Sequence, residues 1–405
     1  MKKNQMILIG LILVVVIVFA VFVFLFLPNI LYNDDRGEVG NQPFGYSTDS
    51  VKAIVVEIIE EGEVQLGEVN QHYQVLQITI LDGEFEGLTT KVDYGKMQLR
   101  PEGLNLKPGD KIIISVTRNI NNQLIIQFQD FVRTQPLLIL FGTFVLFSAM
   151  ISGWKGIRGI LGMGISMAVI IYYIIPQILN GKDPVIISVS GAFFLLAVTL
   201  YLVYGWTYKT HAAVLGTLIS LLLTAFLANY FVKLTRLTGF GSEDALFLLQ
   251  QSGGNINMQG LVLGGMLIGA LGVLDDLVIT QASVVFELFI LDPELSLTNL
   301  YNRAMRVGQD HVAATVNTLV LAYAGAALPM FLLFSIAEAQ LGYLLNLEFV
   351  AEEVVRTMVG SLGLVAAVPL TTILAALIVK NYVNFGPRRD LFGPLINRND
   401  HQHSH

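Results

Sequence analysis

Residues Gly260 to Leu291 read GLVLGGMLIGALGVLDDLVITQASVVFELFIL, and this stretch decides the fold. A helix needs about 20 apolar residues to cross the hydrocarbon layer of a bilayer, and the stretch exceeds that. Two adjacent carboxylates, Asp275 and Asp276, lie near its middle. An acid at bilayer depth is costly, usually faces a bundle interior or water, and marks a path for protons or another cation. The stretch therefore predicts a membrane helix with an intramembrane proton-binding or ion-binding pair.

The polar residues that follow the acids have a helical spacing. Asp276, Thr280, Ser283 and Glu287 are spaced i, i+4, i+7 and i+11, so they share one helix face. The side chain of Asp275 is rotated about 100° from that of Asp276 around the helix axis. Two acids this close cannot both ionise cheaply in a low dielectric, so one is expected to hold a proton near neutral pH. Thr280, Ser283 and Glu287 are therefore predicted relay or lining residues.

An alternative interpretation ends this helix at Val273, so that the acids mark a cytoplasmic helix end. Two acids at a helix C-terminus would oppose the helix dipole, which argues against it. The glycines of the same helix form small-xxx-small pairs, which let helix backbones approach closely. We interpret them as helix-packing positions: Gly260, Gly264, Gly265, Gly269 and Gly272.

The chain after Asp292-Pro293 turns amphipathic. Arg303 and Arg306 suit a helix on the cytoplasmic surface that leads into a further span at 313–336, where Pro329 would produce a kink. His311 is a candidate proton relay, although an interfacial hydrogen-bonded histidine is the alternative. Asn317 and Thr318 are either relay or packing partners of the aspartates.

Other apolar runs predict the remaining spans. Lys2 and Lys3 precede the first run, which is too long for a signal-peptide core and lacks a small-residue cleavage site. It is predicted to be an uncleaved anchor, with a cleaved signal as the alternative. Short-loop Lys and Arg place both termini in the cytoplasm of a plasma-membrane protein. The eight predicted spans are 6–27, 136–152, 156–179, 184–204, 211–231, 258–280, 313–336 and 359–379.

Composition supports a membrane protein. The chain is 54% hydrophobic and only 14% charged, against about 25% charged in soluble domains. The net charge of −7 provides no basic surface for nucleic acid. The sequence has no cysteine, which excludes disulfides and Cys-ligated metals. We predict no cofactor and no metal site; the tail His401 to His405 is either a weak metal binder or, more simply, an unstructured terminus.

Residues 34–133 form a polar block with β character. Its candidate strands are rich in β-branched residues and bounded by turn signals. Five short strands favour a small extracytoplasmic β-barrel of OB type, with a β-meander as the alternative. Its aromatic residues are expected in the core, since few basic residues accompany them. The predicted strands are 51–60, 72–81, 88–94, 111–118 and 123–130.

The predicted fold class is therefore an α-helical polytopic membrane protein of about eight transmembrane helices with an OB-like domain outside. The predicted domains are an N-terminal anchor helix at 1–33, the extracytoplasmic β domain at 34–133, a seven-helix membrane domain at 134–382, and a cytoplasmic tail at 383–405.

Two motifs are similar to a known family. They are GVLDDLVITQAS, at Gly272 to Ser283, and the pattern RxGxDHxAAxVNTLxLAYxGAALP, at Arg306 to Pro329. With the anchor and the external domain, nearly the whole chain resembles the YibE/F-like multi-pass membrane proteins of bacteria. The resemblance implies this architecture and no particular activity.

A second, shorter resemblance covers 265–380. Gly272 to Asp276 looks like the acidic-pair helix of the RND exporters, relatives of the secretion subunits SecD and SecF, whose paired aspartates carry protons. Gly308-Gln309 and Leu328-Pro329-Met330 are similar to the start and middle of a later RND helix. The departures are the eight spans instead of six per half, the acids in the sixth span instead of the fourth, and no intramembrane Lys. These differences weaken the transfer of the proton-carrying role from the RND aspartates to Asp275 and Asp276.

The leading hypothesis is a proton-coupled transporter or secretion-assisting protein that works through Asp275 and Asp276. The alternative is a non-transporting scaffold whose residues 48–131 bind an envelope protein. We predict no enzyme, because HExxH, GxSxG and P-loop motifs are absent. An aspartyl protease dyad is the weakest option, since adjacent acids on one helix point apart. The predicted partners are the lipid bilayer, protons or another cation, and, as an open option, further copies of the chain.

Overall fold

The computed structural model describes residues 50–101, 103–118, 124–336, 341–382 and 394–396. The predicted first span, 6–27, and most of the predicted tail lie outside these residues. The chain divides into two compact units, Met1–Phe147 and Ser148–His405. They are considered one at a time.

The first unit contains a five-stranded antiparallel sheet in the order β3-β2-β1-β4-β5. The long β1 pairs with β2 along most of its length and with β4 through residues 50–54. Shifts in the β1–β2 register after Val55 and Ile58 mark irregularities that bend the strand. The strands are β1 (Ser50–Leu66), β2 (Val69–Ile80), β3 (Thr89–Tyr94), β4 (Lys111–Arg118) and β5 (Leu124–Phe131).

The sheet is open along its two edge strands, because β3 and β5 share no ladder in the described part of the chain. The edges are still close: the Tyr94 ring of β3 lies 4.7 Å from Phe128 and 6.0 Å from Phe131 of β5, between ring centroids. Alternate residues of the inner strands, such as Ile78 and Ile114, are fully buried. The first unit is therefore a small antiparallel sheet with one core, and a closed barrel is not confirmed.

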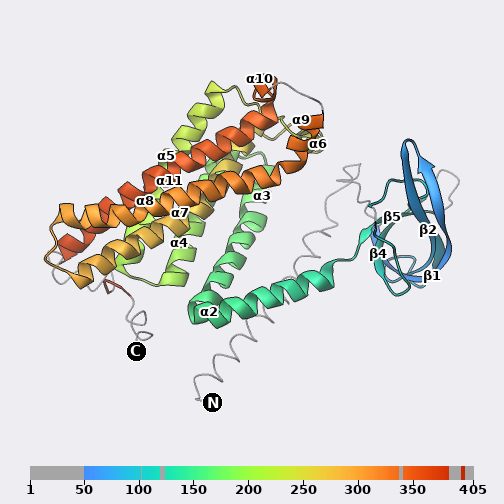
Figure 1. Ribbon diagram of the computed structural model, residues 1–405, viewed down its shortest axis with the longest axis horizontal. Helices are drawn as coiled ribbons and strands as arrows, with labels where there is room; N and C mark the ends of the chain where they lie inside the picture. Colours follow the sequence, from blue (N-terminus) through green and yellow to red (C-terminus); the bar gives the residue numbers. More distant parts are fainter. Residues whose placement is uncertain (1–49, 102, 119–123, 337–340, 383–393, 397–405) are drawn as a thin grey trace, which may run out of the picture. The chain divides into compact units, whose positions relative to one another are not determined.

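The second unit is helical (Figure 1). Its first helix, α2, begins in the first unit and contains a backbone break at Gly153, where φ is 56°. Five residues of π conformation and five of α conformation continue it, as far as Leu179. The helices are α2 (Thr134–Val169), a π turn (Ile170–Ile174), α3 (Ile175–Leu179), α4 (Pro184–Tyr204), α5 (Tyr208–Leu234), α6 (Glu243–Gln251), α7 (Met258–Leu291), α8 (Leu297–Ala326), α9 (Leu328–Ile336), α10 (Leu341–Leu344) and α11 (Glu348–Asn381).

Several of these helices are long and apolar enough to cross a membrane. Within the described residues there are five, Thr134–Leu179, α4, α5, α7 and α11, or six if the bent pair α8 and α9 counts as one span. The predicted spans 136–152 and 156–179 fall within the one helical stretch 134–179. The chain is therefore a multi-pass membrane protein.

The sequence predicted a surface helix followed by a separate span at 313–336, and the structure shows no break between the two. Residues Leu297–Ala326 form one helix, α8, and the interruption comes at Ala327, where α9 leaves at 59°. Pro329 explains the position of the bend, because a proline lacks the N–H that would continue the helical hydrogen bonding.

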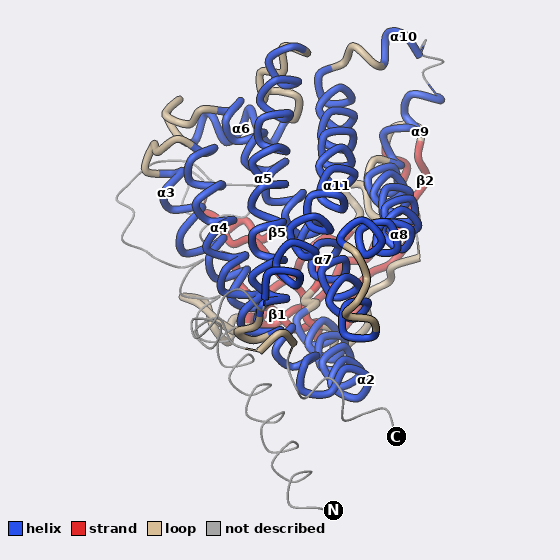
Figure 2. Tube along the Cα trace, turned by 90° about the vertical axis from the view of Figure 1, so that its left-hand side faces the viewer, coloured by secondary structure: helices blue, strands red, loops and turns tan. Residues whose placement is uncertain are grey.

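Helix α7 lies at the centre of the helical unit. It contacts α4, α5, α8 and α11, and Figure 2 shows it between α4 and α8. Backbones approach closely because glycines face hydroxyl side chains: Gly363 of α11 lies against Thr224, and Gly216 of α5 against Thr371. The helix that carries the acids is thus held from several sides.

Candidate functional site

Helix α7 runs without interruption past the acidic pair. It begins after Asn257, whose Oδ1 accepts a hydrogen bond from the Gly260 N–H at 3.0 Å, and it ends at Leu291. The alternative interpretation, in which the helix ends at Val273, is therefore excluded. Asp275 and Asp276 belong to the body of a long helix.

Contacts with α4 indicate where along α7 the acids lie. Gly260 packs against Pro184 at the start of α4, and Gly264 against Ser188 one turn later. Helix α4 is 21 residues long and ends at Tyr204, so the part of it alongside α7 extends to about the level of Thr280. At 1.5 Å per residue, the acids lie about 6–8 Å before that level. The pair therefore lies before the level at which α4 ends and near the middle of α7, which runs from Met258 to Leu291.

The two carboxylates have different surroundings. Asp275 is half-buried, and its Oδ1 is enclosed without a hydrogen-bond partner in the described part of the chain. Asp276 is exposed. An enclosed oxygen without a donor disfavours the charged carboxylate, whereas an exposed carboxyl exchanges protons easily. The pair thus combines a sheltered acid and an accessible one.

The predicted relay residues of α7 lie on its exposed side. Thr280 and Glu287 are exposed and Ser283 is half-buried. The Thr280 hydroxyl donates to the Asp276 carbonyl oxygen at 2.8 Å, and the Ser283 hydroxyl donates to that of Ile279 at 2.8 Å. Both hydroxyl protons are therefore engaged by the helix itself, and the predicted face does not point into the bundle.

The predicted residues of α8 are also peripheral. His311 is half-buried, and Asn317 and Thr318 are exposed. The Thr318 hydroxyl donates to the Ala314 carbonyl oxygen at 3.0 Å. None of the three forms a hydrogen bond or ion pair with the aspartates among the described residues, so the structure does not bring these side chains into one site.

The predicted packing glycines divide into two groups. Gly260 and Gly264 face α4, as described above. A side-chain carbon at Gly269 would lie 3.6 Å from the Tyr323 hydroxyl of α8. At Gly265 and Gly272 it would meet no atom within 4 Å. Only part of the glycine pattern is used for packing within the described chain.

The polar residue at the centre of the bundle is Gln281, which sequence reasoning missed. Its side chain is 2% exposed. Its Nε2 donates to the Ala304 carbonyl oxygen of α8 at 3.1 Å and to the Thr372 hydroxyl of α11 at 2.7 Å. A side-chain carbon at Gly308 would lie 2.8 Å from its Oε1. A lone amide within an apolar run was the available signal, since such residues bridge membrane helices.

We expect Gln281→Leu to destabilise the protein by about 1 kcal/mol, because the substitution removes both interhelical hydrogen bonds while keeping the side-chain volume. The measurement is thermal unfolding of the purified chain in detergent. Gln250→Leu, at an exposed position of α6, is the matched control and should leave the midpoint unchanged. An equal effect of the two substitutions would contradict a bridging role for Gln281.

A line of buried hydroxyl side chains was also missed. It runs along α5 and α11. Each hydroxyl of α5 donates to the carbonyl oxygen four residues earlier, whereas those of Ser361 and Thr371 have no hydrogen-bond partner in the described part of the chain. The members are Thr217, Ser220, Thr224, Ser361, Thr371 and Thr372.

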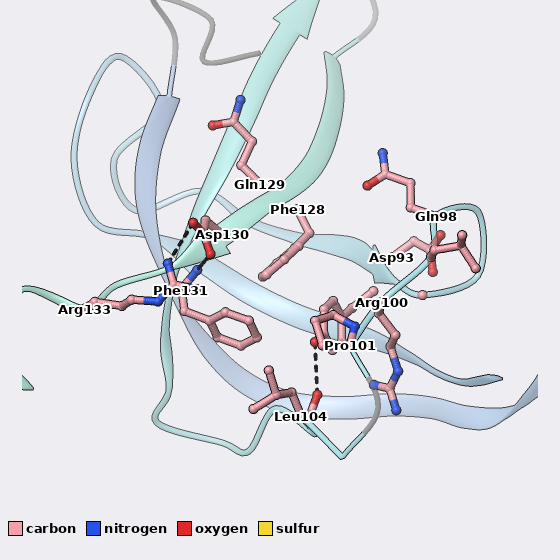
Figure 3. A pocket seen from close by; sticks show the side chains of 13 residues that line it. Asp93, Gln98, Arg100, Pro101, Leu104, Phe128, Gln129, Asp130, Phe131 and Arg133 are labelled. Carbon is pink, nitrogen blue, oxygen red and sulfur yellow. Dashed lines mark hydrogen bonds and ion pairs between the residues drawn. The ribbon is translucent and has the colours of Figure 1, made fainter. Parts of the chain in front are cut away.

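The first unit has one cavity of interest, of about 300 Å³, between the edges β3 and β5 (Figure 3). Phe128 and Phe131 form part of its wall. Arg133 pairs with Asp130 at 2.7 Å and holds the pKa of that carboxyl below its ordinary value. The Arg100 guanidinium lies 5.0 Å from the Tyr94 ring centroid. No group of His, Asp and Glu suited to a metal ion occurs among the residues described.

Comparison with known proteins gives one match. The model of the YibE/F-like protein family matches residues 140–381, which include α4, α5, α7, α8 and α11. No curated protein and no solved structure matches the chain. The family match lends no support to the RND resemblance, which stays a prediction. Because the family model covers more than half of the chain, including the helix with the acidic pair, the chain belongs to the YibE/F-like protein family.

Proposed function

We propose that the chain is a proton-coupled membrane transporter, or a protein that assists secretion, and that Asp275 carries the proton. The observation that supports this most is the Oδ1 of Asp275 on the central helix, which is enclosed and has no hydrogen-bond donor among the residues that the structure describes. Such an oxygen favours a carboxyl that gains and loses a proton as its surroundings change. Protons or another cation are thus the proposed coupling partners.

The two aspartates have separate roles in this proposal. Asp276, on the exposed side of α7, exchanges protons with water, and Asp275 holds them within the bundle. A structural change that opens Asp275 to the other side would complete the transfer. The buried hydroxyls of α5 and α11 offer groups that can pass or orient protons along the bundle, because each hydroxyl both donates and accepts.

The proposed arrangement in the cell follows the distribution of short-loop Lys and Arg. It has the β domain outside the plasma membrane, both termini in the cytoplasm, and eight crossings that include 6–27 and two within 134–179. The approach of β3 and β5 supports a barrel of OB type closed by aromatic side chains.

The proposal is tested by infrared titration of the full-length protein in lipid vesicles. Between alkaline and acidic buffer, the wild type should gain the C=O stretching band of a protonated, weakly hydrogen-bonded carboxyl. Asp275→Asn should lack this band. Glu294→Gln, at an exposed acid beyond α7, should keep it. A band that persists in Asp275→Asn would rule out Asp275 as the proton carrier.

The alternative is a scaffold whose β domain binds an envelope protein. The cavity between β3 and β5, with its aromatic wall, is the observation that favours it. A scaffold does not require Asp275 to change its protonation, so the same titration separates the two functions.

A further inference from the structure

Helix α7 carries a polar and glycine-rich stripe on its exposed side. Its members are spaced seven, four, four and seven residues apart and are all exposed, which places them on one side of the helix. Gly265 and Gly272 meet no neighbouring atom, as noted above. The charged members form no ion pair with other described residues. The stripe consists of Gly265, Gly272, Asp276, Thr280 and Glu287.

Helix α8 presents a second polar surface. Its buried residues are few, Leu300, Ala304 and Gly308. The arginines among the exposed ones form no ion pair within the described ranges. The exposed polar members of this surface are Arg303, Arg306, Gln309, Asp310, Asn317 and Thr318.

These surfaces differ from the lipid-facing surfaces of the same bundle. The exposed residues of α5 and α11 are large and apolar, for example Leu222, Phe226 and Leu362. Lipid tails cover such residues without cost. They cannot cover the acids, amides and arginines of α7 and α8 in the same way, since polar side chains at bilayer depth need polar partners. A matching polar surface would satisfy the groups on this side of the bundle.

The hydrogen bond between Gln281 and Ala304 fixes the relative depth of the two surfaces. Helix α8 runs antiparallel to α7, because Tyr323, later in α8, lies beside Gly269, earlier in α7. Along the membrane normal, Arg306 therefore lies on the same side of Gln281 as Asp276. Arg303 lies on the opposite side, as Glu287 does. The acids lie within about two turns of the arginines along the membrane normal, which is within the reach of an arginine side chain.

We propose that two copies of this chain form a homodimer in the membrane through these surfaces of α7 and α8. Both copies share one membrane orientation, so their two-fold axis lies along the membrane normal and preserves depth. In this dimer α7 of each copy meets α8 of the other, and the two-fold axis repeats the contact, so the interface is isologous. Glu287 pairs with the partner's Arg303. Gly265 and Gly272 let the helices approach closely. This proposal does not depend on proton transfer.

The test is disulfide cross-linking, for which the cysteine-free sequence is ideal. Two differently tagged full-length chains are co-expressed, one with Gly272→Cys and the other with Ala313→Cys. Counting from the Gln281–Ala304 contact, these positions lie at one depth, and both are exposed. Mild oxidation of the membranes should produce a band of twice the chain mass that carries both tags.

The matched control uses two positions that face lipid in this proposal, Leu222→Cys on α5 and Leu362→Cys on α11. This pair should remain monomeric under the same oxidation. Absence of the doubly tagged band in the Gly272 and Ala313 pair would overturn the proposal. Equal cross-linking of both pairs would also overturn it, because it would indicate random collision.

Charge reversal tests the pairing independently of the cross-linking positions. In the Gly272 and Ala313 background, Glu287→Arg alone should lower the cross-linked fraction about tenfold, because like charges across an interface oppose association. Arg303→Glu alone should do the same. The double variant restores the opposite charges and should recover cross-linking. Unchanged cross-linking in either single variant would exclude this pair from the interface.

Discussion

Replacing Asp275 by Asn is expected to abolish proton uptake through the protein. An amide has the shape of the carboxyl but takes up no proton, so the enclosed site of α7 loses its proposed function while its packing is retained. The measurement uses inverted membrane vesicles from cells that express the full-length chain, so that natural cargo is present. A pH-sensitive dye follows the proton flux, which should fall to that of vesicles without the protein.

Three further variants make this result specific. Glu294→Gln removes an exposed acid beyond the end of α7 and should leave the flux unchanged. Asp276→Asn should slow the flux without abolishing it, because Asp276 is the exposed member of the pair. Asp275→Glu should retain part of the flux. Normal flux in Asp275→Asn at normal expression would contradict the proposed role of Asp275.

Replacing Gly308 by Leu is expected to have the largest effect on stability. A side-chain carbon at Gly308 would lie 2.5 Å from a methyl carbon of Val368 and 2.8 Å from the Gln281 Oε1. Neither neighbour can move freely, because both lie between packed helices, and overpacking typically costs about 1–3 kcal/mol. The lost contacts of Gln281 add to this cost. Thermal unfolding of the purified protein in detergent should show a clearly lower midpoint.

Gly360→Leu is the control for this substitution. A side-chain carbon at Gly360 of α11 would meet no atom within 4 Å, and leucine is a better helix former than glycine by nearly 1 kcal/mol. Its midpoint should therefore be equal to or above that of the wild type. A midpoint for Gly308→Leu as high as that of Gly360→Leu would show that α8 does not pack as tightly as the structure indicates.

Local sequence patterns predicted most of the secondary structure. The predicted strand at 72–81 corresponds to Val69–Ile80, and the predicted spans at 184–204 and 211–231 correspond to Pro184–Tyr204 and Tyr208–Leu234. Hydrophobic runs and turn residues are local properties, so they locate elements well. The pattern was less informative at 297–336, where amphipathic and apolar character merge within one helix, α8, and the bend at Ala327 separates α8 from α9.

The site was harder to predict than the helices. Sequence spacing placed Thr280, Ser283 and Glu287 beside Asp276 on one face, but it could not indicate whether that face points into the bundle. A helix of period 3.6 has the same spacing whichever side its neighbours occupy. The hydroxyls of α5 were passed over for the same reason, since a Ser or Thr within a span is buried or exposed according to its neighbours.

Composition and short-range patterns in the sequence predicted that this chain crosses a membrane several times, that a β domain precedes most of the helices, and that two adjacent acids belong to one apolar helix. These features depend on composition and on periodicity along a short stretch of chain. Only the tertiary structure decided that Asp275 is sheltered and Asp276 accessible, and that Gln281 meets Thr372 across 91 positions of sequence. Burial and hydrogen bonding between helices depend on which surfaces pack together, and that choice is made by the whole bundle and not by any single segment.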